Sequence, residues 1–160
     1  MRTLLPLLFL LAACAPTRST PGGGDPPPDD GDGLPQLNFG WSFGMCGGEC
    51  VGEVIIATDQ AVSLETRGWE NELYTTVTGT LHDAVLDELV DAYDALDREG
   101  LQEVYGCPDC ADGGREYLRF LDDIDPPQSD WEWGGPPSEL QTLRATLRTL
   151  ADHMWACNDG

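Results

Sequence analysis

The six cysteines are the residues of this chain whose types and spacing point most directly to chemistry. Four of them form two short motifs, CxxxC at Cys46 and Cys50 and CxxC at Cys107 and Cys110. Such motifs form local disulfides in oxidising compartments, hold zinc as thiolates, or exchange disulfides with a substrate. Each loop carries glycine or proline, which favours two local disulfides, Cys46 with Cys50 and Cys107 with Cys110. Pairing between the two loops stays open as the structural alternative.

Two functional interpretations compete with structural disulfides. The sequence Cys107-Pro108-Asp109-Cys110 has the CPxC pattern of thiol oxidoreductases, in which a helix N-terminus activates the first thiol. Here two glycines follow the motif and acidic residues surround it, so neither a helix nor a positive setting is expected. Zinc held by all four thiolates is the other alternative, and it suits a cytosolic protein better than an exported one. We therefore assign no metal, no cofactor and no catalytic residue.

Two further patterns could carry function. Residues 40–44 match GxSxG, the nucleophile elbow of α/β-hydrolases, but a glycine- and cysteine-rich turn follows where that elbow needs a helix. Trp131 and Trp133 lie two residues apart and hence on one face of a predicted strand. Exposed, they would form a platform for sugars or for an aromatic-rich partner; buried, they would belong to the core. The two glycines after them indicate a sheet edge, so the platform remains a possible ligand site.

Strands are predicted from apolar alternation and from short β-branched runs bounded by turn residues. Four successive segments separated by tight turns indicate an antiparallel meander, and two more segments follow later in the chain. The six predicted strands span 37–44, 51–58, 61–66, 72–78, 116–121 and 130–133.

Two helices are predicted from apolar residues at helical spacing. The first begins at Thr80 and continues to Leu96. The second begins at Ser138, which is expected to form a capping box with Gln141, and continues to Met154. These elements predict an α+β fold, a mainly antiparallel sheet of about four to six strands with both helices packed on one face.

The chain is strongly acidic, with 29 Asp and Glu against 8 basic residues, all of them arginines, and a formal net charge of −21. Such a chain repels nucleic acid and anionic lipid, which excludes proteins that bind a phosphate backbone. The acidity favours solubility, and a cationic partner is the alternative reason for it.

Residues 1–13 combine Arg2, an apolar run over 4–13 and small residues, which is the layout of a secretory signal. The apolar run is about half of the length that a helix needs to span a bilayer core. Residues 11–14, Leu-Ala-Ala-Cys, resemble the lipobox of bacterial lipoproteins. The resemblance implies cleavage before Cys14, acylation of Cys14 and anchoring to a lipid bilayer. Ala15 after the cysteine implies the outer membrane.

Residues 14–36 are rich in Pro, Gly and Asp and predict a disordered tether, and 37–160 predict a single α+β domain. The tether would reach between about 25 Å as a coil and about 70 Å when extended. Export places the cysteines in an oxidising compartment. With Cys14 acylated, an odd number remains, so Cys157 is expected to be unpaired or to pair between molecules.

The two cysteine loops, in their order around strands and a helix, resemble a group of small exported bacterial proteins of unknown function. These proteins carry a CxGxC turn near the start of an α+β domain, here Cys46-x-Gly48-x-Cys50, and the resemblance covers roughly residues 37–121. It implies export and a fold but no activity. The sequence thus predicts a non-enzymatic envelope lipoprotein that binds an unidentified envelope protein or glycan. Thiol–disulfide exchange and a structural zinc site are the alternatives.

Overall fold

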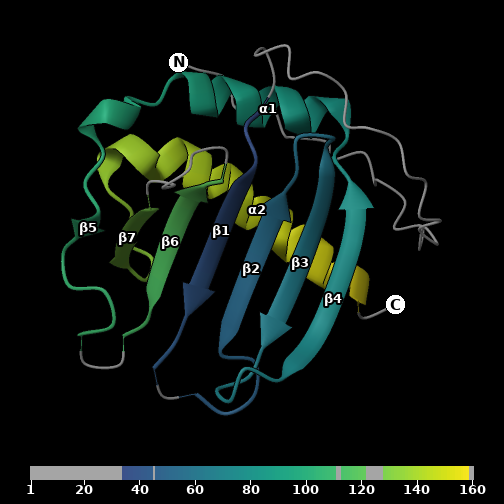
Figure 1. Cartoon of the computed structure of the whole chain (residues 1–160), viewed down its shortest axis with the longest axis vertical. Helices are drawn as coiled ribbons and strands as arrows, with labels where there is room; N and C mark the ends of the chain where they lie inside the picture. Colours follow the sequence, from purple (N-terminus) through teal and green to yellow (C-terminus); the bar gives the residue numbers. More distant parts are fainter. Residues whose placement is uncertain (1–33, 45, 111–112, 122–127, 159–160) are drawn as a thin grey trace, which may run out of the picture.

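The computed structural model describes residues 34–44, 46–110, 113–121 and 128–158 (Figure 1). The predicted signal segment, Cys14 and most of the predicted tether lie outside these residues. Within the described ranges, no helix is both long enough and apolar enough to cross a bilayer.

The protein has the predicted α+β fold, built on one seven-stranded sheet in the order β4-β3-β2-β1-β6-β7-β5. Neighbouring strands are antiparallel except for β5 and β7, which run parallel. The strands are β1 (Leu37–Ser42), β2 (Val51–Ile56), β3 (Ala61–Arg67), β4 (Leu73–Thr80), β5 (Val104–Tyr105), β6 (Arg115–Phe120) and β7 (Gln128–Glu132).

Two helices, α1 (Asp83–Asp94) and α2 (Gln141–Asn158), pack against one face of this sheet. In Figure 1 α2 crosses behind the strands and α1 lies along the end of the sheet where β1 begins. The short 3-10 turns η1 (Arg98–Gly100) and η3 (Ser138–Leu140) follow α1 and precede α2.

Both predicted helix starts were wrong in detail. Thr80 pairs with Ala61 as the last residue of β4, because a threonine-rich, β-branched run favours the strand up to that point. The helix α1 begins later, and His82 caps it by accepting a hydrogen bond from the backbone N–H of Ala84. The predicted capping box at Ser138 does not form, since the Ser138 hydroxyl donates to Glu139 instead.

The sheet has one strand more than the predicted range, because β5 was expected to be loop. The strand β5 has only two residues and pairs with β7, which is distant in sequence, so no local sequence pattern predicts it. As a result β7 is an interior strand and not the predicted edge. The core also begins earlier than the predicted domain, since Leu34 is already packed in it.

The core lies between the sheet and the helices. Alternate residues of β1, Leu37, Phe39 and Trp41, point to the helices, as the period of two requires. They meet the leucine stripe of α2, of which Leu143 and Leu147 are fully buried. Burial of about 1.5–3 kcal/mol per large apolar side chain makes this layer the main source of stability.

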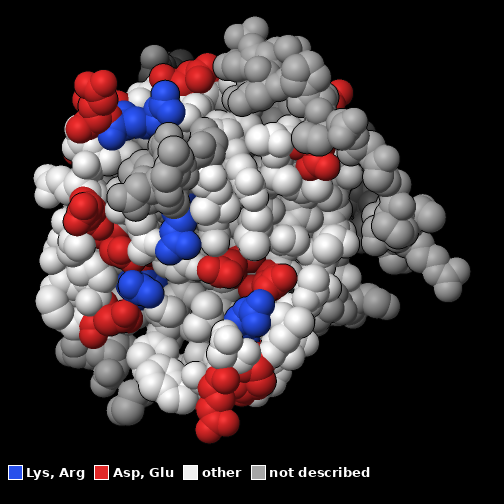
Figure 2. Space-filling model, viewed as in Figure 1, with Lys and Arg blue, Asp and Glu red and all other residues white. Residues whose placement is uncertain are grey.

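The other face of the sheet is open, and it faces the viewer in Figure 2. Arginines and carboxylates lie close to one another over it, among uncharged side chains drawn white. The contacts agree, because Arg67 pairs with Glu65, and Arg115 with Asp130. This face therefore offers no single-sign patch on which a charged polymer would bind.

Tyr117 lies on the open face, with its ring packed over Gly40 and its hydroxyl donating to Glu53. Burial, and then the Glu53 carboxylate, raise the pKa of Tyr117 far above its ordinary value of 10.0. The folded protein therefore keeps a proton that the unfolded chain releases above about pH 10.

From this shift we predict that the free energy of unfolding falls as pH rises above about 10, by up to about 1.4 kcal/mol per pH unit from this residue. The stabilisation is complete below the pKa of the unfolded chain and is lost as pH rises beyond it. Urea unfolding of the wild type and of Tyr117→Phe, between about pH 8 and about pH 11, measures the difference. Equal slopes for the two proteins would contradict the prediction.

Candidate functional site

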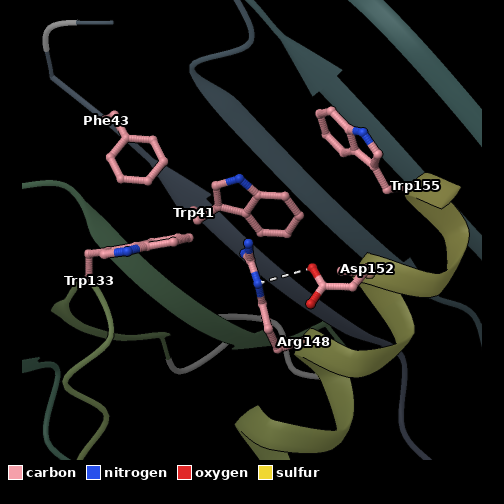
Figure 3. Close-up of a pocket in the computed structure, with 7 residues that line it drawn as sticks. Trp41, Phe43, Trp133, Arg148, Asp152 and Trp155 are labelled. Atoms are coloured by element: carbon pink, nitrogen blue, oxygen red, sulfur yellow. Dashed lines mark ion pairs between the residues drawn. The ribbon is translucent and has the colours of Figure 1, made fainter.

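Aromatic and charged side chains meet in a cavity of about 330 Å³ between the sheet and α2. Three of the five tryptophans line it, together with an arginine and an aspartate (Figure 3). We call it the arginine–aromatic pocket, and its lining residues are Trp41, Phe43, Trp133, Arg148, Ala151, Asp152 and Trp155.

The sheet supplies the aromatic wall through its register. Trp41 is near the end of β1 on the helix-facing side, and Phe43 follows two residues later on the same side. Trp133 follows β7 and is held by a hydrogen bond from its backbone N–H to the carbonyl of Gly114. The rings of Phe43 and Trp133 lie 4.5 Å apart at a tilt of 58°. Tilted pairs at this distance are attractive.

The helix α2 supplies the opposite wall from successive turns. Arg148, Asp152 and Trp155 are spaced four and three residues apart, which places them on one face of the helix. Ala151 lies between them and is buried, so its small side chain leaves space in the pocket.

The Arg148 guanidinium lies between two tryptophan rings (Figure 3). Its central carbon is 4.5 Å from the centroid of Trp41 and 4.7 Å from that of Trp133. Its Nε is 3.4 Å from Oδ1 of Asp152, whose side chain is 68% exposed. An exposed i,i+4 ion pair contributes about 0.3–0.5 kcal/mol, whereas each partly desolvated cation–π contact contributes about 0.5–2 kcal/mol. The rings, rather than the aspartate, therefore fix the arginine.

One nitrogen of this guanidinium has no partner. Nη1 of Arg148 is buried and makes no hydrogen bond to any described residue. A buried donor left unsatisfied costs about 1–3 kcal/mol, and more when it is charged. The guanidinium in the pocket wall therefore has hydrogen-bonding capacity that the described residues leave unused.

The two tryptophans of the predicted platform, Trp131 and Trp133, lie in different environments. Trp131 is 1% exposed and donates through Nε1 to Oε2 of Glu116 at 2.9 Å, so it is core and no ligand reaches it. Trp133 is partly exposed and lines the pocket. The platform of two exposed tryptophans does not form, because β5 covers the expected edge and the next layer of the core lies over Trp131.

Glu116 of β6 is fully buried. It lies directly opposite Trp41, a pocket residue, in the β1–β6 register. Arg144 of α2 binds its carboxylate with two hydrogen bonds, Nη2 to Oε1 at 2.7 Å and Nε to Oε2 at 3.1 Å. This bidentate pair, together with Trp131, fixes α2 against the sheet one turn before Arg148.

The four motif cysteines form the two predicted local disulfides, Cys46 with Cys50 and Cys107 with Cys110. The Cα atoms are 5.6 Å and 5.4 Å apart, which is ordinary for a disulfide. A zinc site would need all four sulfurs as free thiolates, and pairing between the loops would need each cysteine bonded to one of the other loop. The two local disulfides agree with neither alternative. Among the cysteines that the structure describes none is free, Cys157 included, so of the two alternatives for Cys157 the unpaired thiol is wrong.

The disulfide between Cys107 and Cys110 is exposed and lies beside a smaller cavity that Trp133 and Glu132 also line. The first described residues after it, Gly113 and Gly114, are not helical, and Glu132 accepts a hydrogen bond from the Cys107 backbone N–H at 3.0 Å. A neighbouring carboxylate disfavours the thiolate that disulfide exchange needs. The GxSxG serine is likewise occupied, because the Ser42 hydroxyl accepts from Arg115 on the open face.

Sequence reasoning missed Trp41, Phe43, Arg148 and Trp155. The signals were present, since Trp41 and Phe43 have the spacing of one strand face, and 148, 152 and 155 form a second stripe beside the leucines of the last helix. The sequence alone did not show that this face of the strand and this face of the helix pack against each other.

Comparison with known proteins adds no identity to this geometry. The sequence matches no protein-family model and no curated protein.

Proposed function

We propose that this chain is an exported bacterial lipoprotein whose folded domain binds a ligand in the arginine–aromatic pocket without catalysing a reaction of it. The observation that carries the proposal is a cavity lined by three tryptophans and by Arg148, whose buried Nη1 has no hydrogen-bond partner among the described residues. Small-molecule sites combine an apolar aromatic lining with a few convergent polar groups, in cavities of about 300–1,000 Å³. This pocket has that composition and lies at the small end of the range.

The lining favours binding over catalysis. Among the described lining residues the charged side chains are Arg148 and Asp152, paired with each other, and none is a serine, cysteine, histidine or lysine. General acid–base or nucleophilic chemistry needs such groups within hydrogen-bond reach of one another.

The lipid anchor rests on the resemblance of residues 11–14 to a lipobox. Acyl chains on Cys14 would hold the domain at the membrane, and the acidic tether would let it search the space near the surface. Mass spectrometry of the membrane-extracted protein tests this part, with acylated Cys14 as the expected N-terminus. An unmodified or internal Cys14 would overturn the anchor and leave the pocket proposal intact.

Ligand binding is tested by tryptophan fluorescence, since Trp41, Trp133 and Trp155 all report on the pocket. The probes are uncharged oligosaccharides, oligogalacturonate, a peptide with a free carboxylate, inorganic phosphate and tetramethylammonium. We expect at least one class to bind the full chain and Trp133→Ala to weaken that binding roughly tenfold, the loss of about one aromatic contact.

The matched control is Trp69→Ala, because Trp69 is 67% exposed and does not line the pocket. It should leave the affinity unchanged. If no probe class binds, or if both variants bind as the wild type does, the proposal fails.

A further inference from the structure

The ligand of the arginine–aromatic pocket must meet three chemical demands. It needs a face that packs on indole rings, because three tryptophans line the cavity. It needs an acceptor atom for the Arg148 guanidinium, whose side chain is 25% exposed and whose Nη1 no described residue satisfies. It also needs a donor for the Asp152 carboxylate, which is largely exposed and whose Oδ1 lies 3.4 Å from Nε of Arg148.

A cationic ligand is disfavoured because the pocket contains its own cation. Rings that recognise ammonium groups do so through their negative faces. Here one face each of Trp41 and Trp133 is already occupied by the Arg148 guanidinium, within 4.7 Å of both centroids. A second positive charge would be placed next to the first.

An anionic ligand is disfavoured by the charge around the arginine. Asp152 pairs with Arg148, so a carboxylate already lies beside the guanidinium. The chain as a whole carries a net charge of −21. A single arginine in this negative electrostatic potential can bind an acceptor atom in direct contact. It does not raise the local concentration of anions around the pocket.

From these demands we propose that the pocket binds an uncharged pyranose unit of a saccharide, an inference that rests on the ligand-binding function proposed above. A pyranose ring has a face of C–H groups, whose partial positive charge suits the negative face of an indole. Each of its hydroxyls both donates and accepts hydrogen bonds. One such unit can therefore accept from Arg148 and donate to Asp152 while it stacks on an aromatic ring.

The arrangement of the rings indicates a chain of sugars rather than an isolated one. Figure 3 shows Trp133 and Trp155 on opposite sides of the pair formed by Arg148 and Asp152. Trp155, away from Trp133 in this view, thus adds a second aromatic side chain beside the polar pair. At about 330 Å³ the cavity itself is small, so further units lie along its rim.

The test compares two matched probes, an uncharged oligosaccharide and oligogalacturonate of the same length, which carries a carboxylate on every pyranose ring. The protein is the full chain in a detergent without a sugar headgroup, because such a headgroup would compete. Titration by tryptophan fluorescence, repeated by calorimetry, gives the affinities. We test oligomers of β-linked glucose, β-linked N-acetylglucosamine and α-linked mannose as the uncharged set.

We expect one uncharged oligomer to bind at least roughly tenfold more tightly than oligogalacturonate, with its monosaccharide weaker than its hexamer. Arg148→Met should reduce the affinity more than Arg148→Lys, which keeps the charge, and Trp69→Ala should not change it. Circular dichroism and the urea midpoint of each variant show that it is folded. Asp152→Asn provides a second test on a largely exposed residue and should also weaken binding.

Three results overturn the saccharide inference. Binding only of phosphate, of a carboxylate peptide or of tetramethylammonium would leave the ligand-binding function standing and refute the saccharide. Preference for oligogalacturonate would refute the uncharged class. Absence of binding by every probe would refute the saccharide and the proposed function together.

Discussion

Replacing Arg144 by methionine is expected to lower the free energy of unfolding by about 3–5 kcal/mol. The change leaves the Glu116 carboxylate with no cationic partner at a position where it has no exposed surface. A buried charge whose partner is removed costs this much because the carboxylate was already taken out of water. Its remaining hydrogen bond, from Nε1 of Trp131, does not replace the two that Arg144 donates.

Urea unfolding followed by circular dichroism measures the effect, and an unchanged m-value shows that the folded and unfolded states remain comparable. The matched control is Arg67→Met. Its pair with Glu65 has a short contact of 2.5 Å, but both side chains are more than a quarter exposed. Exposed pairs contribute about 0–1 kcal/mol, so this variant should lose no more than that.

The double variant Glu116→Gln with Arg144→Met separates the buried charge from lost packing. The neutral amide needs no cation and still accepts from Trp131, so the double variant should be more stable than Arg144→Met alone. A coupling of about 0.5–3 kcal/mol is expected between the two positions. If Arg144→Met costs no more than Arg67→Met, the ion pair does not hold α2 against the sheet.

Local patterns account for the parts of the fold that sequence reasoning found. The meander follows from alternation such as Leu37, Phe39 and Trp41, and each short turn fixes its own pairing. The disulfides were predictable for the same reason, since cysteines only four and three positions apart come together without the rest of the chain.

The pocket was not predictable because its parts come from distant places in the chain. Trp41 and Arg148 are brought together only by the crossing of α2 over β1, the central strand, and Trp133 only by the insertion of β7 between β6 and β5. The buried Glu116 left a clearer signal, since it alternates with Leu118 and Phe120 on the core side of β6. A charge in that position requires a partner from the facing helix.

The absence of a side chain at Gly52 matters both for the packing of the core and for the pocket. It lies opposite Trp41 in the β1–β2 register, and the indole ring occupies the space where a side chain would begin. A Cβ at Gly52 would overlap that ring. Trp41 is only 7% exposed and is packed against Phe39 and Arg148, so the ring has little room to move.

Gly52→Ala is therefore expected to destabilise the protein by about 1–3 kcal/mol, the usual cost of overpacking a core. It should also weaken ligand binding, since a displaced Trp41 no longer holds the Arg148 guanidinium at 4.5 Å. Urea unfolding and the fluorescence titration measure the two effects on the same sample.

The control is Gly79→Ala, which adds the same methyl group to the same helix-facing side of the sheet. Its Cβ would meet only Val62, at an ordinary 3.9 Å, so stability should change little and binding not at all. Should Gly52→Ala behave like Gly79→Ala in both measurements, Trp41 does not hold the guanidinium in place. Loss of stability without loss of affinity would mean that Trp41 supports the core but that the ligand is recognised by Trp133 and α2 alone.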